Sequence, residues 1–259
     1  MLDKILIVYS EKLTNKHLET LRKVREIVGG RNVLIVKSQD LQKSCFEDIK
    51  LAITIGGDGT FIRTASYISD ELILGINSEP EYSEGALTSL RENQLGFLEK
   101  ILKGEFKIIK RERARVIRNK VVLDELALNE VYVGAYSQFH TSRYAIKFKE
   151  KEEEQRSSGV LIATGSGSKA WYKSAGGTPF PYDERKLKFI VREPYFGDHI
   201  FKPTIFTGEI LEGGSIEIIS KRHDGGIIAI DANSILDFNI PDKVEIELSD
   251  KPLNVIKLK

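Results

Sequence analysis

The chain has 259 residues, of which 41% are hydrophobic and 30% are charged, and its formal net charge is only +1. That length allows one large core or two modest ones, and the balanced charge predicts neither a nucleic-acid partner nor an anionic membrane surface. The single cysteine, Cys45, excludes an internal disulfide and a zinc site built on several thiolates. No apolar run approaches the roughly 18 residues that cross a bilayer, and a strand-like run close to the initial methionine leaves no room for a signal or transit peptide. We therefore expect a cytoplasmic protein.

The first hundred residues alternate between strand-like and helical patterns. Apolar runs predict strands at Lys4–Tyr9, Val33–Val36, Leu51–Ile55 and Leu72–Ile76. Helical spacing predicts helices at Asn15–Val28, Phe61–Ile68 and Leu90–Leu102. The first helix carries a stripe formed by Leu18, Leu21, Val24 and Ile27. Continuous apolar strands separated by helices predict a Rossmann-like, parallel α/β domain over residues 1–104.

After about residue 105, strand-like segments follow one another with little helix between them. They are Lys107–Arg118, Val121–Val133, Thr141–Phe148, Leu187–Arg192, Ser215–Ser220, Ile227–Ile230 and Val244–Leu248. One short helix is expected at Ser168–Ser174, and the charged run Lys149–Glu154 is expected at a solvated hairpin tip. This pattern predicts a mostly β, sandwich-like domain over residues 105–259.

A glycine-rich segment, Gly56-Gly57-Asp58-Gly59-Thr60, follows the third predicted strand and precedes a predicted helix. Ligands of open parallel sheets bind beyond the carboxyl ends of the strands. Glycines let the backbone approach a bulky anion, and a helix N-terminus attracts phosphate. An ordinary tight turn is the simpler alternative, but five such residues at a strand-to-helix junction favour phosphate binding.

Asp58 is the unexpected member of this segment, because a carboxylate repels phosphate. It makes sense if it orients and deprotonates an attacking hydroxyl, or helps to hold Mg²⁺. Phosphoryl transfer through a loose transition state needs positioning more than base strength. The sequence therefore predicts a kinase with Asp58 as the catalytic residue. Gly56, Gly57, Gly59, Thr60 and Arg63 would then contact the phosphates.

Gly-Gly-Asp-Gly-Thr resembles the loop of a kinase superfamily that includes NAD kinases, diacylglycerol and sphingosine kinases and, with a small change, 6-phosphofructokinases. Three further segments resemble NAD kinases in particular. They are Asn129-Glu130, the stretch from Ser157 through Trp171 to Gly177, and the segment around Asp231. A pair of this type can hold a ribose diol, although Asn-Glu at a strand end is more often structural.

The resemblance implies a set of residues that contact NAD. They are Asn77, Asn129, Glu130, Thr164, Ser166, Lys169, Ala170, Trp171, Ser174 and Asp231. Trp171, the only tryptophan, is equally compatible with base stacking and with a buried anchor. Asp231 stands where the family has an Asp-Gly-Gln type segment, which here reads Asp231-Ala232-Asn233. The four histidines, His17 among them, are expected to be structural or at the surface.

Departures from the common bacterial pattern resemble the mitochondrial-type branch of NAD kinases. They include Ser83-Glu84-Gly85 and the segment Gly167-Ser168-Lys169-Ala170-Trp171. Together with the expected lack of a transit peptide, this predicts a prokaryotic or archaeal relative of that branch. The resemblance implies ATP as phosphoryl donor, NAD as acceptor, Mg²⁺ as cofactor and a homodimer or larger homo-oligomer.

Two other functions remain compatible with the glycine loop. A lipid or sphingoid-base kinase would show an apolar, membrane-seeking surface. A non-catalytic NAD(P) sensor would keep the NAD-side residues and lose the catalytic aspartate. Detection of NADP made from NAD and ATP separates all three.

Overall fold

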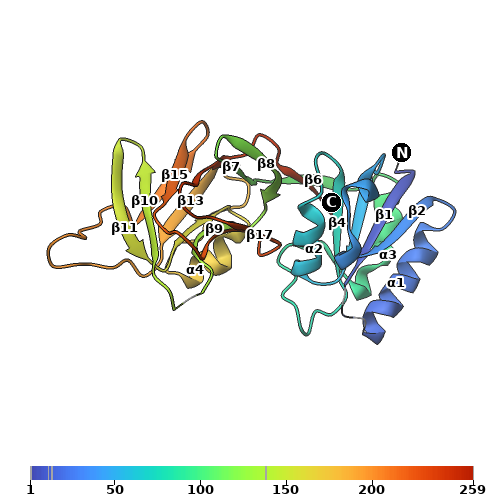
Figure 1. The fold of residues 1–259 in the computed structure, drawn as a ribbon. Helices are drawn as coiled ribbons and strands as arrows, with labels where there is room; N and C mark the ends of the chain where they lie inside the picture. The colour runs from blue at the N-terminus through green and yellow to red at the C-terminus, as the bar shows by residue number, and fades with distance from the viewer. Residues whose placement is uncertain (1, 11, 13, 138, 259) are drawn as a thin grey trace. The chain divides into compact units, whose positions relative to one another are not determined.

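The computed structural model describes residues 2–10, 12, 14–137 and 139–258. It divides the chain into two compact units, one formed by Met1–Lys110 with Leu253–Lys259 and the other by Arg111–Pro252 (Figure 1). The sequence pattern predicts one domain over all of residues 105–259. The last strand instead returns to the first unit, where Asn254 pairs with Leu72 in parallel register.

Within the described residues, the first unit contains a seven-stranded sheet in the order β2-β1-β3-β4-β19-β6, with β5 beside β4. The strands are β1 Lys4–Tyr9, β2 Asn32–Lys37, β3 Leu51–Ile55, β4 Leu72–Asn77, β5 Leu90–Arg91, β6 Lys107–Arg111 and β19 Leu253–Lys257. The pairs formed among β1 to β5, and the pair of β4 with β19, are parallel. The parallel α/β prediction is thus confirmed.

Three helices of the described chain cover this sheet: α1 Asn15–Val28, α2 Asp58–Ala65 and α3 Gly96–Leu102. Figure 1 shows α1 and α3 on one face and α2 on the other. The inner side of α1 buries His17, Thr20, Val24 and Val28. Leu18, which was predicted on the buried stripe, is 47% exposed. The buried face is therefore rotated slightly from the one that apolar spacing suggests, and it includes a histidine.

Two predicted helices of the first unit have different bounds in the structure. α2 begins at Asp58, three residues before the predicted start, because the glycine loop itself turns into the helix. Residues 90–102 do not form one helix: β5 is followed by a 3-10 turn at Glu92–Gln94 and then by α3. The short strand β5 extends the sheet next to β4 through the pairs Ile76–Leu90 and Asn77–Arg91.

The second unit consists of two antiparallel sheets, in the orders β11-β10-β15-β18-β7-β8 and β14-β13-β12-β9-β16-β17. The first contains β7 Ala114–Arg118, β8 Val121–Ala127, β10 Ser142–Phe148, β11 Lys151–Ser157, β15 Ser215–Ser220 and β18 Lys243–Leu248. The second contains β9 Glu130–Ala135, β12 Val160–Ala163, β13 Lys186–Val191, β14 Thr207–Leu211, β16 Gly226–Ile230 and β17 Ser234–Asp237. One apolar core joins both sheets, with Ile146 and Ile246 from one and Val131 and Phe189 from the other. The sandwich-like prediction is therefore confirmed.

Several predicted strands are pairs of strands in the structure. The segment Lys107–Arg118 splits into β6 and β7, which belong to different sheets, and Val121–Val133 splits into β8 and β9. The charged run Lys149–Glu154 is only partly a turn, because β11 begins at Lys151 and pairs with β10 along its whole length. Main-chain pairing at a sheet edge needs no apolar side chains, so charge alone did not reveal this strand. Among the described helices, none is long and apolar enough to cross a membrane.

Candidate active site

The glycine loop lies at the carboxyl end of β3, where ligands of parallel sheets bind. A Cβ atom on Gly56 would lie 2.5 Å from Thr60 Oγ1, and one on Gly57 would lie 2.5 Å from Ser83 Oγ. A Cβ on Gly59 would meet nothing within 4 Å. Close packing therefore requires glycine at the first two positions. Gly57 caps α2 without a side-chain hydrogen bond among the described residues, so the N–H groups of the first turn suit an anion.

Asp58, in the first turn of α2, is held in place by two main-chain N–H groups. Ala86 N donates to Oδ2 at 3.0 Å, and Leu87 N donates to Oδ1 at 2.9 Å. Each carboxylate oxygen can accept more than one hydrogen bond. The side chain is only half-buried, so it can also meet a hydroxyl group or a cation. The structure thus fixes a carboxylate beside a helix N-terminus that attracts phosphate.

The other predicted residues of the first unit have mainly internal contacts. Thr60 is buried, and its carbonyl accepts from Thr64 Oγ1 at 2.8 Å. Arg63 lies in the last turn of α2, and its Nη2 is 3.5 Å from Gln39 O, away from the first turn. Asn77 is buried at the end of β4, where Nδ2 donates to Ser83 O (2.8 Å) and Oδ1 accepts from Glu79 N (3.2 Å). Asn77 therefore shapes the loop next to the glycine segment.

In the second unit, Asp231 organises the predicted Asn129-Glu130 pair. Its carboxylate accepts from the main-chain N–H groups of Leu128 (2.6 Å), Asn129 (2.7 Å) and Glu130 (2.9 Å). Asp231 is buried and has a φ of +49°, which is unusual for a non-glycine residue. The structure thus brings these three predicted residues together, because the Asp231 carboxylate bonds to the main chain of both Asn129 and Glu130.

Asn129 and Glu130 keep unused acceptors. Asn129 Oδ1 and Glu130 Oε2 are buried without a hydrogen-bond partner among the described residues. Such groups are costly unless something binds them, and the hydroxyls of a ribose could supply the missing donors. Burial, with Asp231 nearby, raises the pKa of Glu130 to about 7. A buried carboxyl whose pKa lies near neutrality is typical of functional sites.

The predicted Thr164–Ser174 stretch packs directly against this pair. Thr164 Oγ1 donates to Leu128 O (2.5 Å) and accepts from Ser166 N (3.1 Å) and Gly167 N (3.2 Å). A Cβ on Gly167 would lie 2.2 Å from Asn129 O, so this position requires glycine. Ser166 Oγ accepts from Arg111 Nη1 at 3.1 Å, a contact that the motif alone did not suggest.

Trp171 is partly buried in α4, Trp171–Ser174. Its ring stacks on Tyr132 with centroids 5.3 Å apart, and the Arg192 guanidinium lies 4.9 Å from the ring centroid. Trp171 is therefore anchored within the second unit, which favours the structural alternative for one of its faces. Lys169, Ala170 and Ser174 are exposed.

Sequence reasoning missed the main-chain groups that hold Asp58. The N–H groups of Ala86 and Leu87 follow Gly85, which has a φ of +64° and whose Cβ would lie 2.5 Å from Asn77 Nδ2. Gly85, near the end of a polar loop, was the only sign in the sequence that this loop has a special conformation. Main-chain N–H donors cannot be recognised from the sequence, because almost every residue type has one.

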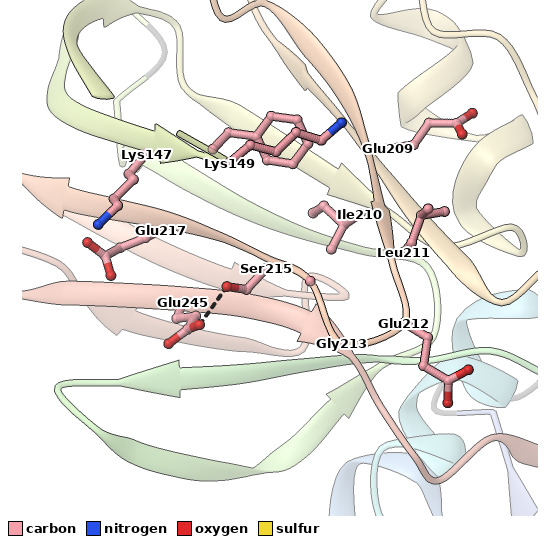
Figure 2. Close-up of a pocket in the computed structure, with 12 residues that line it drawn as sticks. Lys147, Lys149, Glu209, Ile210, Leu211, Glu212, Gly213, Ser215, Glu217 and Glu245 are labelled. Carbon is pink, nitrogen blue, oxygen red and sulfur yellow. Dashed lines mark hydrogen bonds between the residues drawn. The ribbon is translucent and has the colours of Figure 1, made fainter. Parts of the chain in front are cut away.

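A cavity of about 550 Å³ in the second unit contains none of the predicted site residues (Figure 2). It is lined by segments around Lys147–Lys149 and Glu209–Ser215. Its carboxylates have partners: Glu212 pairs with Arg185, Glu217 pairs with Lys243, and Glu245 accepts from Ser215 Oγ. Because these carboxylates already have partners, nothing indicates that they bind a ligand in this cavity.

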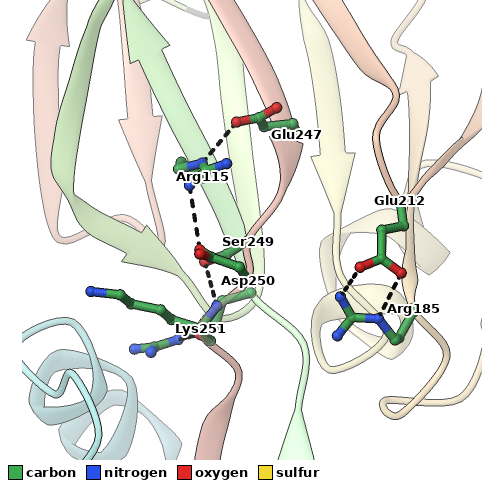
Figure 3. A network of polar contacts seen from close by, with 8 residues as sticks. Arg115, Arg185, Glu212, Glu247, Ser249, Asp250 and Lys251 are labelled. Atoms are coloured by element: carbon green, nitrogen blue, oxygen red, sulfur yellow. Dashed lines mark hydrogen bonds and ion pairs between the residues drawn. The ribbon is translucent and has the colours of Figure 1, made fainter.

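A polar network supports the ends of the strands nearby (Figure 3). Arg115 on β7 bonds to Glu247 on β18 at 2.7 Å and to Asp250 at 3.3 Å, and Arg185 Nη2 lies 2.6 Å from Glu212 Oε1. These contacts fasten the segments of the second unit close to where the chain leaves it, and we assign them a structural role.

The chain combines a parallel α/β unit that has a Gly-Gly-Asp-Gly loop after a strand with a β-sandwich unit that carries buried, unpartnered acceptor atoms. The model for the ATP-NAD kinase N-terminal domain matches residues 1–106. An NAD kinase of Fusobacterium nucleatum is 31% identical over 219 residues, which cover 79% of this chain and 74% of that relative. The chain therefore belongs to the NAD kinase family.

Other relatives place this chain among enzymes from diverse sources. A probable NADH kinase of Oryza sativa is 25% identical over 270 residues, covering 95% of this chain and 82% of that one. Archaeal NAD kinases and a human mitochondrial NAD kinase also match. A crystal structure of an NAD kinase from Archaeoglobus fulgidus in complex with ATP has a TM-score of 0.73 at 22% identity, covering 99% of this chain and 93% of that one. At that identity the likeness establishes the fold.

Proposed function

We propose that this protein transfers the γ-phosphoryl group of ATP to the 2′-hydroxyl of the adenosine ribose of NAD, giving NADP and ADP. The observation that carries the proposal is Asp58, a carboxylate held by Ala86 N and Leu87 N beside a helix N-terminus. Simple phosphate binding does not require a negative charge at this position. A carboxylate is needed there if a hydroxyl acceptor must be oriented and deprotonated.

The bond changes follow from this placement. Asp58 accepts the proton of the 2′-hydroxyl, whose oxygen forms the new bond to the γ-phosphorus, while the bond from that phosphorus to the bridging oxygen breaks and ADP leaves. The N–H groups at the start of α2 and the loop of Gly56, Gly57, Gly59 and Thr60 bind phosphate oxygens. The chemistry depends mainly on position, which the two main-chain contacts to Asp58 supply.

The second unit binds the acceptor in this proposal. Asn129 Oδ1 and Glu130 Oε2 accept hydrogen bonds from ribose hydroxyls, and Asp231 fixes the main chain of this pair. Thr164 and Ser166 belong to the adjoining loop. Lys169, Ala170, Trp171 and Ser174 lie toward the adenine. Trp171 keeps its contact with Tyr132 and offers only its remaining surface to the base.

A divalent cation fits this arrangement if the substrate phosphates supply most of its ligands. Within the described residues, no group of three or more His, Cys, Asp and Glu side chains could hold a metal ion. Mg²⁺ in kinases usually binds one or two carboxylates together with substrate phosphates, and Asp58 suits that single-carboxylate role. When bound, Mg²⁺ would neutralise charge that develops on the transferred group.

The proposal extends to a cytoplasmic, homo-oligomeric enzyme. Resemblance to the family supports the assembly, and exposed valines on the edge strand β8, Val121 at 64% and Val122 at 54%, are compatible with a buried interface there. Light scattering coupled to size-exclusion chromatography measures the assembly directly. A monomer at micromolar concentration would contradict this part of the proposal alone.

Asp58→Asn tests the catalytic assignment. The variant keeps the size of the side chain but removes the proton acceptor, so we expect kcat for NADP formation to fall by about 10²–10⁴-fold. ATP binding, measured by calorimetry, should persist. Asp70→Asn, at an exposed position in the same unit, serves as the matched control. Near wild-type NADP formation by Asp58→Asn would show that Asp58 is not the base.

A further inference from the structure

His17 is a buried histidine that the proposed chemistry does not use. It lies in the first turn of α1, and its side chain is only 5% exposed. Its Nδ1 is 2.7 Å from Ser78 Oγ, and its Nε2 is 3.4 Å from Glu79 Oε2. Each ring nitrogen has its own partner, so one side chain contacts two consecutive residues directly after β4.

Ser78 and Glu79 begin a loop, residues 78–87, that contains no helix or strand. Besides His17, Lys16 of the same helical turn pairs with Glu81 in this loop. Asn77 binds both Glu79 N and Ser83 O, and Gly85 packs against the Asn77 amide. The first half of the 78–87 loop is therefore fixed to α1 and to the end of β4.

The far end of the same loop holds the catalytic carboxylate. Ala86 and Leu87 donate the two main-chain hydrogen bonds to Asp58, and Ser83 packs against the position of Gly57. A loop without regular structure keeps its shape only through such contacts. If its first half moved, the donors at its far end would move as well, and Asp58 would lose its fixed orientation.

We propose that His17 is a positioning residue for phosphoryl transfer, which it serves by anchoring the 78–87 loop that orients Asp58. This inference rests on the proposed function of Asp58. Within the described residues, His17 bonds to Ser78 and Glu79 and not to Asp58 or the glycine loop, so its effect is transmitted through Ser78, Glu79 and the loop. Displacement of a reacting group by about 1 Å can cost about a hundredfold in rate.

The experiment compares His17→Ala with Val24→Ala in the full chain. Val24 lies on the same buried side of α1 but packs in the apolar core. His17→Ala should lower kcat for NADP formation by about ten- to a hundredfold, with KM for ATP and NAD changed less than about threefold. Amide exchange of the 78–87 loop should accelerate at least about tenfold. Val24→Ala should lower the thermal midpoint without either change.

Two further variants distinguish loss of the contact between His17 and Ser78 from a general loss of folding. Ser78→Ala removes the Nδ1 contact from the loop side and should reproduce the fall in kcat, whereas His17→Asn, which can still bond to Ser78, should restore part of it. The proposal is overturned if His17→Ala keeps wild-type kcat. It is also overturned if exchange in the loop rises equally in Val24→Ala. Wild-type protein that makes no NADP would instead refute the proposed function, while the exchange comparison would still test the anchoring of the loop.

Discussion

Replacing Glu130 by glutamine should change how the stability of the second unit depends on pH. Burial, with a contribution from nearby Asp231, raises the pKa of Glu130 from 4.5 to about 7. Below pH 7 the folded protein therefore keeps this carboxyl largely protonated. The unfolded chain ionises it near the ordinary value of 4.5. Glutamine has the same shape and does not titrate.

The direction in which the stability changes with pH follows from proton binding. Between the unfolded and folded pKa values, the folded state binds more protons than the unfolded state, so the stability contributed by Glu130 is complete below the unfolded pKa and is lost as pH rises through about 7. The separation of the two pKa values corresponds to about 3.5 kcal/mol at most. The free energy of unfolding of Glu130→Gln minus that of wild type should therefore increase by about 1–3 kcal/mol from pH 4.5 to pH 8.

Trp171 provides the assay, because it is the only tryptophan of the chain and stacks on Tyr132 in the second unit. Urea unfolding followed by its fluorescence at several pH values reports on this unit. Glu153→Gln is a control, because the pKa of Glu153 is shifted in the opposite direction to that of Glu130. Partial burial would raise the pKa of Glu153, but hydrogen bonds from Ile205, Gln155 and Thr204 outweigh it and lower the pKa. If the difference in unfolding free energy between Glu130→Gln and wild type stayed constant from pH 4.5 to pH 8, the pKa of Glu130 would not be raised in the folded protein.

Further predictions concern the glycine loop, the cation and the acceptor. Gly57→Ala should lower kcat/KM for ATP at least about tenfold, because its Cβ would lie 2.5 Å from Ser83 Oγ. Gly59→Ala, whose Cβ meets nothing within 4 Å, should leave the thermal midpoint unchanged or slightly higher, and a lower midpoint would contradict the packing described for the loop. Removal of divalent cations by EDTA should abolish NADP formation, and Mg²⁺ should restore it; full activity in EDTA would exclude the cation. Because a rice relative is named a probable NADH kinase, NAD and NADH should be compared as acceptors. We expect phosphorylation of NAD whether or not NADH is also accepted.

Local sequence patterns predicted much of the first unit. β1, α1 and β3 have the expected bounds, since uninterrupted apolar runs and helical spacing are local signals. The return of β19 beside β4 could not be predicted in this way, because it depends on pairing between Asn254 and Leu72. The start of α2 was missed since Asp58-Gly59-Thr60 has weak helical preference.

The candidate site was predictable in its residues more than in their contacts. Motifs pointed to Asp58, Asn129 and Glu130 through residue type and order. They did not reveal that Asp231 binds the main chain of residues 128–130 from about a hundred positions away. Nor did they reveal that His17 contacts Ser78, because a histidine among apolar helix positions gives no sign of its partner.

The proposed reaction transfers a phosphoryl group to one particular hydroxyl. Purified wild-type protein incubated with ATP, Mg²⁺ and NAD can be followed by phosphorus NMR, which distinguishes a 2′-phosphomonoester of NAD from free phosphate. We predict that NADP and ADP appear in equal amounts, and that Asp58→Asn forms neither at a comparable rate. Formation of ADP with free phosphate but no NADP, or no consumption of NAD at any donor concentration, would contradict the account.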